Sequence, residues 1–400
     1  MRIAHVLRRL SFDDWGGTEQ VVWNIAKAQK AAGHEVRIFA TSALNPKSHE
    51  TVDGLEIFRF RPVYPWWPMP RSLVEELDLK GGNPFVPGLG RALREWKPEV
   101  IHCHAMARIA ELCLRTAQRI GAKSVVSLHG GGANVPADEA KSLRAPTRGR
   151  LPWGKAVDIL MGWTRRVPED FGGIVCVGED EYLKYKERHS HVMYLPNGVD
   201  TRLFSDLSRS GQLQNSADTR LFSVLCVARI DRQKNQMMIV EALARHPGMK
   251  ARLVGPVTQP DYKAELEARA AELGVADRLS FSGALKPGSS ELVAEYAGAD
   301  LFVLPSRHEP FGIVVLEAWA AGLLVVASDV GGLGRLCAAH PKAAITFLPG
   351  DAAAMDAALK EAQDRLVYAP GTIRETARAA AAQYDWASLA ERLVDFIRQI

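Results

Sequence analysis

Short apolar runs alternate with stretches of helical periodicity along most of the chain. The first run predicts a strand over Arg2–Leu7, followed by a glycine-containing loop and an amphipathic helix over Gln20–Ala32. Alternating strands and helices form parallel sheets, so this half predicts an α/β domain of the doubly wound type. Its further expected elements are strands Glu35–Ala40, Glu99–His102 and Ser124–Leu128, and helices Gly90–Trp96 and Ala107–Ile120.

The alternation restarts after a polar interruption. Ser205–Arg220 carries Ser, Asp and Gly with no apolar face, and we interpret it as an interdomain linker. The second half therefore predicts another doubly wound domain, and ligands of such folds bind beyond the carboxyl ends of the strands. The elements expected there are strands Leu221–Ala228, Ala251–Val254, Arg278–Phe281 and Asp300–Leu304, and helices Gln236–Arg245 and Tyr262–Leu273. A last amphipathic helix is expected over Tyr384–Ile400.

Composition narrows the class of protein only a little. A chain of 400 residues with 47% hydrophobic and 24% charged residues is typical of a globular protein of two or three domains. Its net charge of +4 is too small to imply nucleic-acid binding. Five cysteines without C-x-x-C spacing favour a reducing compartment over a disulfide framework or a zinc site. The N-terminus lacks the apolar region of a signal peptide, and no apolar run is long enough to span a bilayer, so we expect neither secretion nor a membrane span.

Charged residues follow two strands of the second half. Arg229 stands at a strand end in ARIDRQKNQ, and Lys234 is expected at the start of the next helix. A later strand is followed by PSRHEPFGIVVLEAWAAG, in which Gly312 opens a helix whose free N–H groups favour a phosphate. Glu309 and Glu317 lie about two helical turns apart, so both can face one site, and Glu317 suits a ribose diol. Solvated cations and a buried, satisfied glutamate are the structural alternatives.

Histidines and glycines follow the strands of the first half. His129 by itself is typical of a capping residue, but three glycines after it leave the backbone open to a ligand and favour a functional role. His102 and His104 share one face of a strand without a third ligand nearby in sequence, so we interpret them as structural rather than metal-binding. Gly16 and Gly17 follow the first strand, where a loop without side chains lets phosphate or acceptor approach; a plain tight turn is the alternative.

Six segments occur in the order found in one enzyme family: GGTEQVV, SLHGG, LPNGVD, ARIDRQKN, EPFGIVVLE and SDVGG. The chain resembles, over nearly its whole length, the retaining GT-B glycosyltransferases of family 4. The resemblance implies two Rossmann-like domains facing across a cleft, the N-terminal one binding acceptor and the C-terminal one the nucleotide sugar. It also implies that the C-terminal helix crosses back onto the first domain. The expected domains are therefore 1–205 with 384–400, and 206–383.

The resemblance also assigns roles by position. Arg229 and Lys234 bind the donor diphosphate and stabilise the charge that grows on it, Glu309 holds hydroxyls of the transferred hexose, and Glu317 binds the ribose. His129 reaches the donor sugar. The catalytic set is thus Arg229, Lys234, Glu309 and His129, and the donor-binding set is Gly16, Gly17, Asn197, Gly283, Leu285, Phe311, Gly312, Ile313 and Glu317.

Three of these donor-binding assignments rest on backbone or turn geometry. The backbone of Phe311 to Ile313 is expected to contact sugar and phosphate, and Gly283 to Leu285 to contact the base. Asn197 fits a donor contact and a simple Asn-Gly turn about equally well. The sequence contains no D-x-D triplet, so we expect no metal, and no cofactor besides the nucleoside diphosphate sugar that serves as donor substrate.

The function that the resemblance implies is a metal-independent hexosyltransferase that retains anomeric configuration. It would use a UDP, GDP or ADP sugar and a glycan or lipid-linked acceptor, in cell-surface polysaccharide or glycolipid biosynthesis. A nucleotide-sugar epimerase or a sugar phosphorylase on the same fold, and a non-catalytic nucleotide-sugar-binding protein, are the alternatives. Pro310, Gly178 and Gly334-Arg335 depart from the family pattern in loops that line the sugar and base pockets, which leaves the donor open.

One basic segment stands apart from these motifs. Lys141–Arg166 carries seven cations against a single acid, Asp158, with Trp153 and Trp163 interleaved. Such a segment can lie on anionic lipid, which predicts a cytoplasmic protein in peripheral contact with the inner membrane face, without a nucleic-acid partner. A solvated loop and helix explain it equally well. The aromatic segment Arg61–Arg71 (RPVYPWWPMPR) is either an acceptor wall or an ordinary structured loop.

Overall fold

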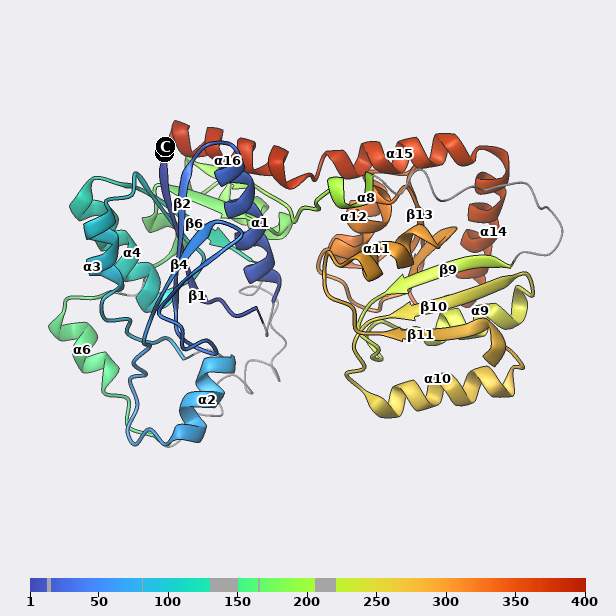
Figure 1. The fold of residues 1–400 in the computed structure, drawn as a ribbon, viewed down its shortest axis with the longest axis horizontal. Helices are drawn as coiled ribbons and strands as arrows, with labels where there is room; N and C mark the ends of the chain where they lie inside the picture. The colour runs from blue at the N-terminus through green and yellow to red at the C-terminus, as the bar shows by residue number, and fades with distance from the viewer. Residues whose placement is uncertain (13–15, 81, 130–149, 165, 206–220) are drawn as a thin grey trace. The chain divides into compact units, whose positions relative to one another are not determined.

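The computed structural model describes residues 1–12, 16–80, 82–129, 150–164, 166–205 and 221–400. The chain forms two compact units, Met1–Pro196 with Trp386–Ile400, and Asn197–Asp385 (Figure 1). Each unit is a largely parallel sheet with helices between successive strands. The predicted α/β class with two Rossmann-like units is confirmed.

The first unit contains an eight-stranded sheet in the order β3-β4-β2-β1-β5-β6-β7-β8. All neighbouring strands are parallel except β3 and β4. The strands are β1 (Arg2–Arg9), β2 (Glu35–Thr41), β3 (His49–Val52), β4 (Leu55–Phe60), β5 (Val100–Cys103), β6 (Lys123–Leu128), β7 (Gly173–Cys176) and β8 (Val192–Tyr194). The helices are α1 (Gly17–Ala31), α2 (Arg71–Lys80), α3 (Leu89–Trp96), α4 (Ala107–Ile120), α6 (Gly154–Leu160), α7 (Glu179–Tyr185) and α16 (Trp386–Gln399), with a 3₁₀ turn at Pro168–Asp170.

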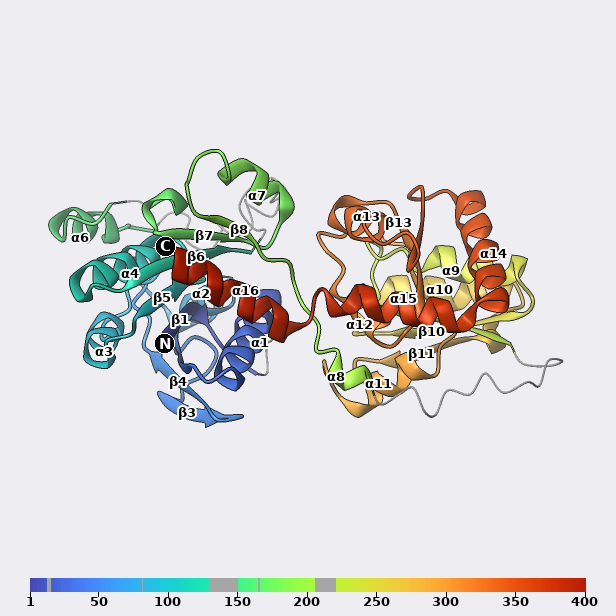
Figure 2. The same ribbon diagram turned by 90° about the horizontal axis from the view of Figure 1, so that it is seen from above.

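Helices cover both faces of this sheet, and the period-two alternation of β1 shows why. Ile3 and Leu7 are buried on the face that packs against α1 and α16, whereas Ala4 and Val6 are buried on the face of α3 and α4. A strand buried on both faces reads as a continuous apolar run, as β1 and β5 do. The C-terminal helix α16 lies beside α1 in both views, with Leu393 fully buried between them and the sheet (Figures 1 and 2).

The second unit contains six strands, all parallel, in the order β11-β10-β9-β12-β13-β14. The strands are β9 (Phe222–Val227), β10 (Met249–Val254), β11 (Leu279–Gly283), β12 (Leu301–Leu304), β13 (Leu324–Ser328) and β14 (Ala344–Phe347). The helices are α8 (Arg202–Ser205), α9 (Met237–Arg245), α10 (Pro260–Glu272), α11 (Ser290–Ala297), α12 (Ile313–Ala320), α13 (Gly331–Ala338), α14 (Ala352–Tyr368) and α15 (Pro370–Ala382), with a 3₁₀ turn at Ala276–Arg278.

The second unit begins at Asn197, before the expected boundary at 206. Phe204 of α8 is buried in the core of the second unit, and its ring packs edge-on against Tyr296 with centroids 5.6 Å apart. The backbone N–H of Val199 also donates to the carbonyl of Tyr384 at 2.9 Å. These contacts tie the segment before the expected linker to the second unit. Of that linker, residues 206–220 lie outside the described part of the chain.

Candidate functional site

In the second unit, the predicted diphosphate-binding cations lie in the turn after β9. The helix α9 begins only at Met237, so Lys234 lies in the turn before the helix and not at its start. Buried Asp231 organises this turn. Its Oδ1 accepts from the backbone N–H of Lys234 at 3.0 Å, and its Oδ2 lies 3.4 Å from Nη2 of Arg229. The sequence analysis did not single out Asp231, because an Asp in a polar loop has no distinctive pattern.

Lys234 and Glu309 form an ion pair between the loops that follow two neighbouring strands, β9 and β12. The Nζ of Lys234 lies 2.7 Å from Oε2 of Glu309, and the two side chains are only 12% and 14% exposed. An ammonium group has three N–H donors and a carboxylate has several acceptor positions, so each keeps capacity for a ligand. Arg229 is 53% exposed and donates to Oε1 of Gln233 at 3.3 Å. This arrangement suits a ligand that carries phosphate next to hydroxyl groups.

The loop around Gly312 places a helix N-terminus beside this ion pair. Gly312 caps α12 with a φ of 86°, a left-handed conformation that favours glycine, so the prediction that it opens the helix is confirmed. Phe311 and Ile313 flank it, both half-buried. A Cβ on Gly332 would lie 1.9 Å from the carbonyl oxygen of Pro310. Glycine in the SDVGG segment is therefore what lets the start of α13 pack against the Gly312 loop.

Glu317 lies on α12 and is oriented by a tyrosine. The hydroxyl of Tyr296, on α11, donates to Oε2 of Glu317 at 2.7 Å. Burial raises the pKa of the Glu317 carboxyl, and the tyrosine hydrogen bond partly opposes this shift. No described residue hydrogen-bonds to Oε1, which can accept from a ligand hydroxyl. A tyrosine within an apolar helical run offers no functional signal, so sequence analysis missed Tyr296.

The other predicted donor residues of the second unit lie at the ends of its elements. Gly283 ends β11 with a φ of 72°, and its carbonyl accepts from the backbone N–H of Gly255 at 2.8 Å. Leu285 is partly buried against the core. Asn197 is the first residue of the unit. Gly283 and Leu285 thus follow a strand on the same sheet as the ion pair, whereas Asn197 lies where the chain enters the unit.

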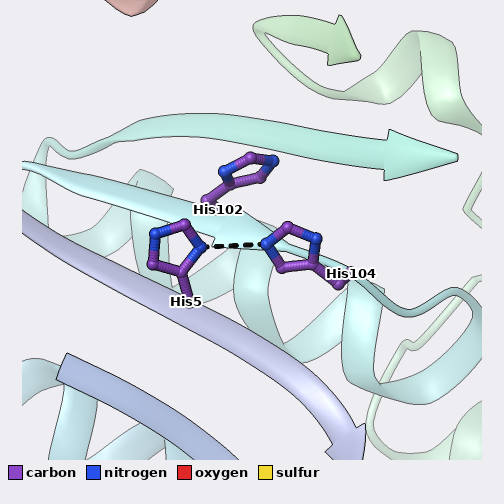
Figure 3. Close-up of side chains that lie close together, drawn as sticks. All are labelled: His5, His102 and His104. Atoms are coloured by element: carbon purple, nitrogen blue, oxygen red, sulfur yellow. Dashed lines mark hydrogen bonds between the residues drawn. The ribbon is translucent and has the colours of Figure 1, made fainter. Parts of the chain in front are cut away.

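In the first unit, four histidines gather on three neighbouring strands and the loops after them: one in the middle of β1, two at and just after the end of β5, and one just after β6. The strand register pairs His5 on β1 with His102 on β5, and His104 follows two residues later on the same face. His129 comes directly after β6, the next strand of the sheet. Figure 3 shows the rings of His5, His102 and His104 together. The sequence analysis treated His102 and His104 as an isolated pair, because the third histidine comes from a strand far earlier in the chain.

These histidines are hydrogen-bonded and neutral. Burial lowers the pKa of His5 and that of His129 to about 4 each, and those of His102 and His104 well below the ordinary value. The Nδ1 of His5 lies 3.0 Å from Nε2 of His104, and the Nε2 of His102 lies 2.7 Å from Oγ of Ser127. The group is therefore an uncharged polar network at neutral pH.

Three of the rings come close enough to be considered as metal ligands. One nitrogen from each of His5, His102 and His104 lies within 4.8 Å of the others. However, His5 and His104 share a hydrogen bond, and the rings of His102 and His104 are in contact, tilted by 35° with centroids 4.1 Å apart. Metal ligands instead point their lone pairs at one centre. The geometry favours hydrogen bonding and ring packing.

Gly16 and Gly17 lie at the N-terminus of α1, after β1. Gly16 is the N-cap residue, and a Cβ there would lie 2.5 Å from Oε2 of Glu19. Glu19 is buried and pairs with Arg9 at 3.3 Å. Gly16 therefore has a local structural reason in addition to its predicted ligand role: it leaves room for the Glu19 side chain.

The fold matches that of solved structures. A glycosyltransferase from Rickettsia africae matches with a TM-score of 0.67, covering 100% of this chain and 98% of that one at 15% identity. Two Rossmann-like units with a C-terminal helix that returns to the first are the GT-B fold of glycosyltransferases.

Sequence comparison gives the family. Residues 15–203 match Glycosyltransferase Family 4, and residues 212–365 match Glycosyl transferases group 1. The D-inositol 3-phosphate glycosyltransferase of Actinosynnema mirum is 30% identical over 351 residues, covering 80% of this chain and 77% of the relative. The chain belongs to this family of retaining, hexosyl-transferring enzymes, which use nucleotide sugars. The resemblance seen in the sequence motifs is confirmed.

Two further relatives align over almost their full length. The glycogen synthase of Mycobacterium tuberculosis is 26% identical over 402 residues, covering 94% of this chain and 89% of the relative. The GDP-mannose:cellobiosyl-diphosphopolyprenol alpha-mannosyltransferase of Xanthomonas campestris is 25% identical over 411 residues, covering 99% and 96%. One name gives glycogen as the product and the other a diphosphopolyprenol-linked acceptor, so the comparisons leave the acceptor open.

Proposed function

We propose that this chain transfers a hexose, without a metal ion, from a nucleoside diphosphate sugar to a lipid-linked glycan at the inner face of the membrane. The proposed binding of the donor rests on the 2.7 Å contact between Nζ of Lys234 and Oε2 of Glu309. A cation and a carboxylate this close match the two neighbouring parts of a nucleotide sugar, the diphosphate and the sugar hydroxyls. The base of the donor, UDP, GDP or ADP, stays open.

The reaction follows from the charges on this loop pair. As the bond from the anomeric carbon to the phosphate breaks, negative charge grows on the diphosphate, where Lys234 and Arg229 stabilise it with the N-terminus of α12. Glu309 accepts hydrogen bonds from sugar hydroxyls and holds the ring. The acceptor oxygen bonds to the anomeric carbon on the face that the phosphate leaves, and its proton passes to a phosphate oxygen. Configuration is retained without a protein nucleophile.

Product release and nucleotide binding test this assignment. We expect one of UDP, GDP and ADP to raise the melting temperature of the wild type, since a ligand that binds only the native state stabilises it. The shift should be lost in Arg229→Ala/Lys234→Ala and kept in Lys263→Ala, whose exposed partner Glu267 lies on α10. Release of the nucleoside diphosphate should require an added acceptor. Conversion of the nucleotide sugar into its epimer without an acceptor would favour an epimerase, and neither reaction would favour a binding protein.

An exposed apolar surface on α6 supports a lipid-linked acceptor. Ile159 and Leu160 are 79% and 87% exposed, and Met161 and the cation Lys155 are exposed beside them. Exposed apolar side chains next to basic ones are typical of membrane-surface helices. Trp153 instead packs against Phe85, with ring centroids 5.7 Å apart. We therefore place the membrane contact at Ile159 and Leu160 and not at Trp153, which is 37% exposed.

Arginines next to α6 add positive charge to this surface. A groove of about 400 Å³ is lined by Arg115, Gln118, Arg119 and Arg166. Arg115 and Arg166 both pair with buried Glu111, which fixes the groove against α4. Anionic head groups, or the diphosphate of a polyprenyl carrier, would complement it. Residues 141–149 and 165 of the basic segment lie outside the described residues. Within the described part of the chain, no helix has the length and apolar character needed to cross a membrane.

Vesicle sedimentation tests whether the protein binds the membrane surface. We expect the wild type to co-sediment with vesicles containing phosphatidylglycerol and not with pure phosphatidylcholine. Ile159→Ser/Leu160→Ser should lose most of this binding, whereas Val367→Ser/Tyr368→Ser, an equally exposed apolar pair on α14, should keep it. Equal transfer to a soluble glucan and to a polyprenyl-diphosphate-linked glycan, with no vesicle binding, would contradict the lipid-linked acceptor.

A further inference from the structure

A hydrogen-bonded chain runs through the first unit from α1 to the end of β6. Oε1 of Gln29 lies 2.8 Å from Nε2 of His5, Nδ1 of His5 lies 3.0 Å from Nε2 of His104, and Nδ1 of His104 lies 3.0 Å from Nε2 of His129. Figure 3 shows the central link, between His5 and His104. The chain thus connects a buried glutamine to the histidine that the family resemblance places at the donor sugar.

Neutral rings give this chain only two arrangements. The low pKa values of His5 and His129, about 4 each, keep both rings uncharged at neutral pH, and His104 is buried in the same way. A neutral imidazole has one N–H and one bare nitrogen, so it donates to one neighbour and accepts from the other. All links must therefore point the same way, either toward Gln29 or away from it.

The glutamine at the buried end selects the direction. Because Oε1 of Gln29 faces His5, His5 donates through Nε2, His104 donates through Nε2 to His5, and His129 donates through Nε2 to His104. The Nδ1 of His129 is then a bare acceptor, and no described residue hydrogen-bonds to it. Turning the amide of Gln29 would reverse every link and put the proton of His129 on Nδ1.

We propose that Gln29, acting through His5 and His104, holds His129 in the tautomer with its proton on Nε2, so that Nδ1 accepts a hydrogen bond from a hydroxyl of the bound sugar. The hydroxyl must then donate, which fixes its rotation. This inference rests on the proposed function, since it takes His129 to contact the donor sugar. Gln29, His5 and His104 are positioning residues that act through His129.

A metal ion held by His5, His102 and His104 is the competing use of the same rings. An ion there would have to replace the proton that His5 and His104 share across 3.0 Å. It would also need His102 to turn away from its ring contact with His104. A metal ion there would break the hydrogen-bonded chain between Gln29 and His129. Metal binding and tautomer control therefore exclude each other, and an experiment can distinguish them.

Nitrogen-15 NMR of protein labelled at histidine reports which ring nitrogen carries each proton. In the wild type at pH 7, we expect His129 to be in one tautomer, protonated at Nε2. The NMR signal of His129 is identified as the one that disappears in His129→Gln. Gln29→Met keeps the side-chain shape but removes the acceptor, and should give both tautomers at His129. We expect kcat to fall about fivefold, the size of one neutral hydrogen bond, with the donor KM within about twofold. Gln20→Met on the same helix should leave tautomer and rate unchanged.

Each remaining outcome decides the inference. A His129 tautomer that stays single in Gln29→Met overturns it, and so does stoichiometric Zn²⁺ binding by the wild type that moves the His5, His102 and His104 signals. If Gln29→Met does not fold, His104→Gln breaks the chain at another link and should free the same tautomer. Failure of the proposed function looks different: no nucleotide sugar turns over or stabilises the wild type, although the His129 tautomer still responds to Gln29→Met. That result would overturn the sugar contact and leave the tautomer control standing.

Discussion

The carboxyl ends of the two sheets carry different chemistry, although the strands that end there are built alike. In the second unit, Arg229, Lys234 and Glu309 bring full charges to the ends of β9 and β12. In the first unit, the middle of β1 and the carboxyl ends of β5 and β6 bring together four histidines that are neutral and largely buried. The same topology therefore positions a charged site in one unit and an uncharged polar network in the other.

The difference follows from the cost of burying charge. The Arg229 side chain is 53% exposed to solvent. Lys234 is largely buried, and its ammonium group is paired with the carboxylate of Glu309. His5 has no exposed surface and no carboxylate partner, so it remains neutral and satisfies both ring nitrogens by hydrogen bonds. A charged site suits binding and stabilising a diphosphate, whereas a neutral network suits orienting hydroxyl groups.

Loss of the central cation is expected to give the largest effect. In Lys234→Ala, the departing diphosphate loses a cation and Glu309 is left unpaired, so we expect kcat/KM to fall by about 100-fold or more. Steady-state transfer with saturating acceptor measures this. Lys263→Ala, which removes an exposed pair on the same unit, should stay within about twofold of the wild type.

A double variant separates stability from catalysis. In Lys234→Ala/Glu309→Gln no unpaired carboxylate remains, so we expect the melting temperature to recover toward the wild-type value while transfer stays low. If transfer activity recovered together with stability, Lys234 would act only by neutralising Glu309. That result would contradict a role for Lys234 in binding the diphosphate.

Acid should destabilise the first unit before the second. The pKa of His5 is about 4 in the folded state against an ordinary value of 6.5, so the unfolded state binds the proton more readily. The stability from this lowered pKa is fully present above pH 6.5 and is lost as the pH falls toward 4, with a limit of about 3 kcal/mol. Hydrogen exchange resolved by unit, followed from pH 7 to pH 4, measures the loss.

His5→Asn is the control for the acid effect, because asparagine can still hydrogen-bond but does not titrate in this range. We expect its first unit to lose less stability than the wild type between pH 6.5 and 4. Parallel loss in both units, or an unchanged slope in His5→Asn, would show that the histidine network is not what makes the two units differ.

Removing one carboxylate oxygen of the ribose site is expected to have an intermediate effect. Glu317→Gln keeps an acceptor for Tyr296 or for the ligand but no longer carries a charge, so donor KM should rise about tenfold with kcat little changed. Initial rates over a range of donor concentrations measure the split. An equal fall in kcat would place Glu317 in the chemistry and not in ribose binding.

The sequence predicted what depends on neighbours along the chain. Largely apolar runs located the strands, for example Leu301–Leu304 within the expected Asp300–Leu304, because strands buried on both faces leave few polar positions. The opening of α12 at Gly312 was also predictable, since a glycine before an apolar helical run is a local signal. The family motifs that carried the resemblance are such local segments.

Contacts between distant segments were not predictable in this way. His5 meets His102 only through the register of β1 with β5, and Asp231 is identified only by the backbone that it binds. The unit boundary was placed late because Phe204 looks like one more apolar residue before a polar stretch, although its burial assigns it to the second unit. A single local sequence pattern predicts neither the order of strands in a sheet nor the core in which an apolar residue is buried.

The smallest expected effect concerns the group that orients the ribose carboxylate. The Tyr296 hydroxyl stabilises the charged form of Glu317, so Tyr296→Phe should raise the pKa of Glu317 further above its ordinary range. The charged carboxylate, which binds hydroxyl groups most strongly, would then be lost at a higher pH as the solution is acidified. We expect donor KM to rise about threefold at pH 7 and by a larger factor at lower pH, while Tyr368→Phe, at an exposed tyrosine, changes neither.

A KM ratio between variant and wild type that is independent of pH would mean that Tyr296 positions Glu317 by packing alone. In that case the second unit would also hold a polar group whose function does not depend on charge, and the contrast with the histidine network would be weaker.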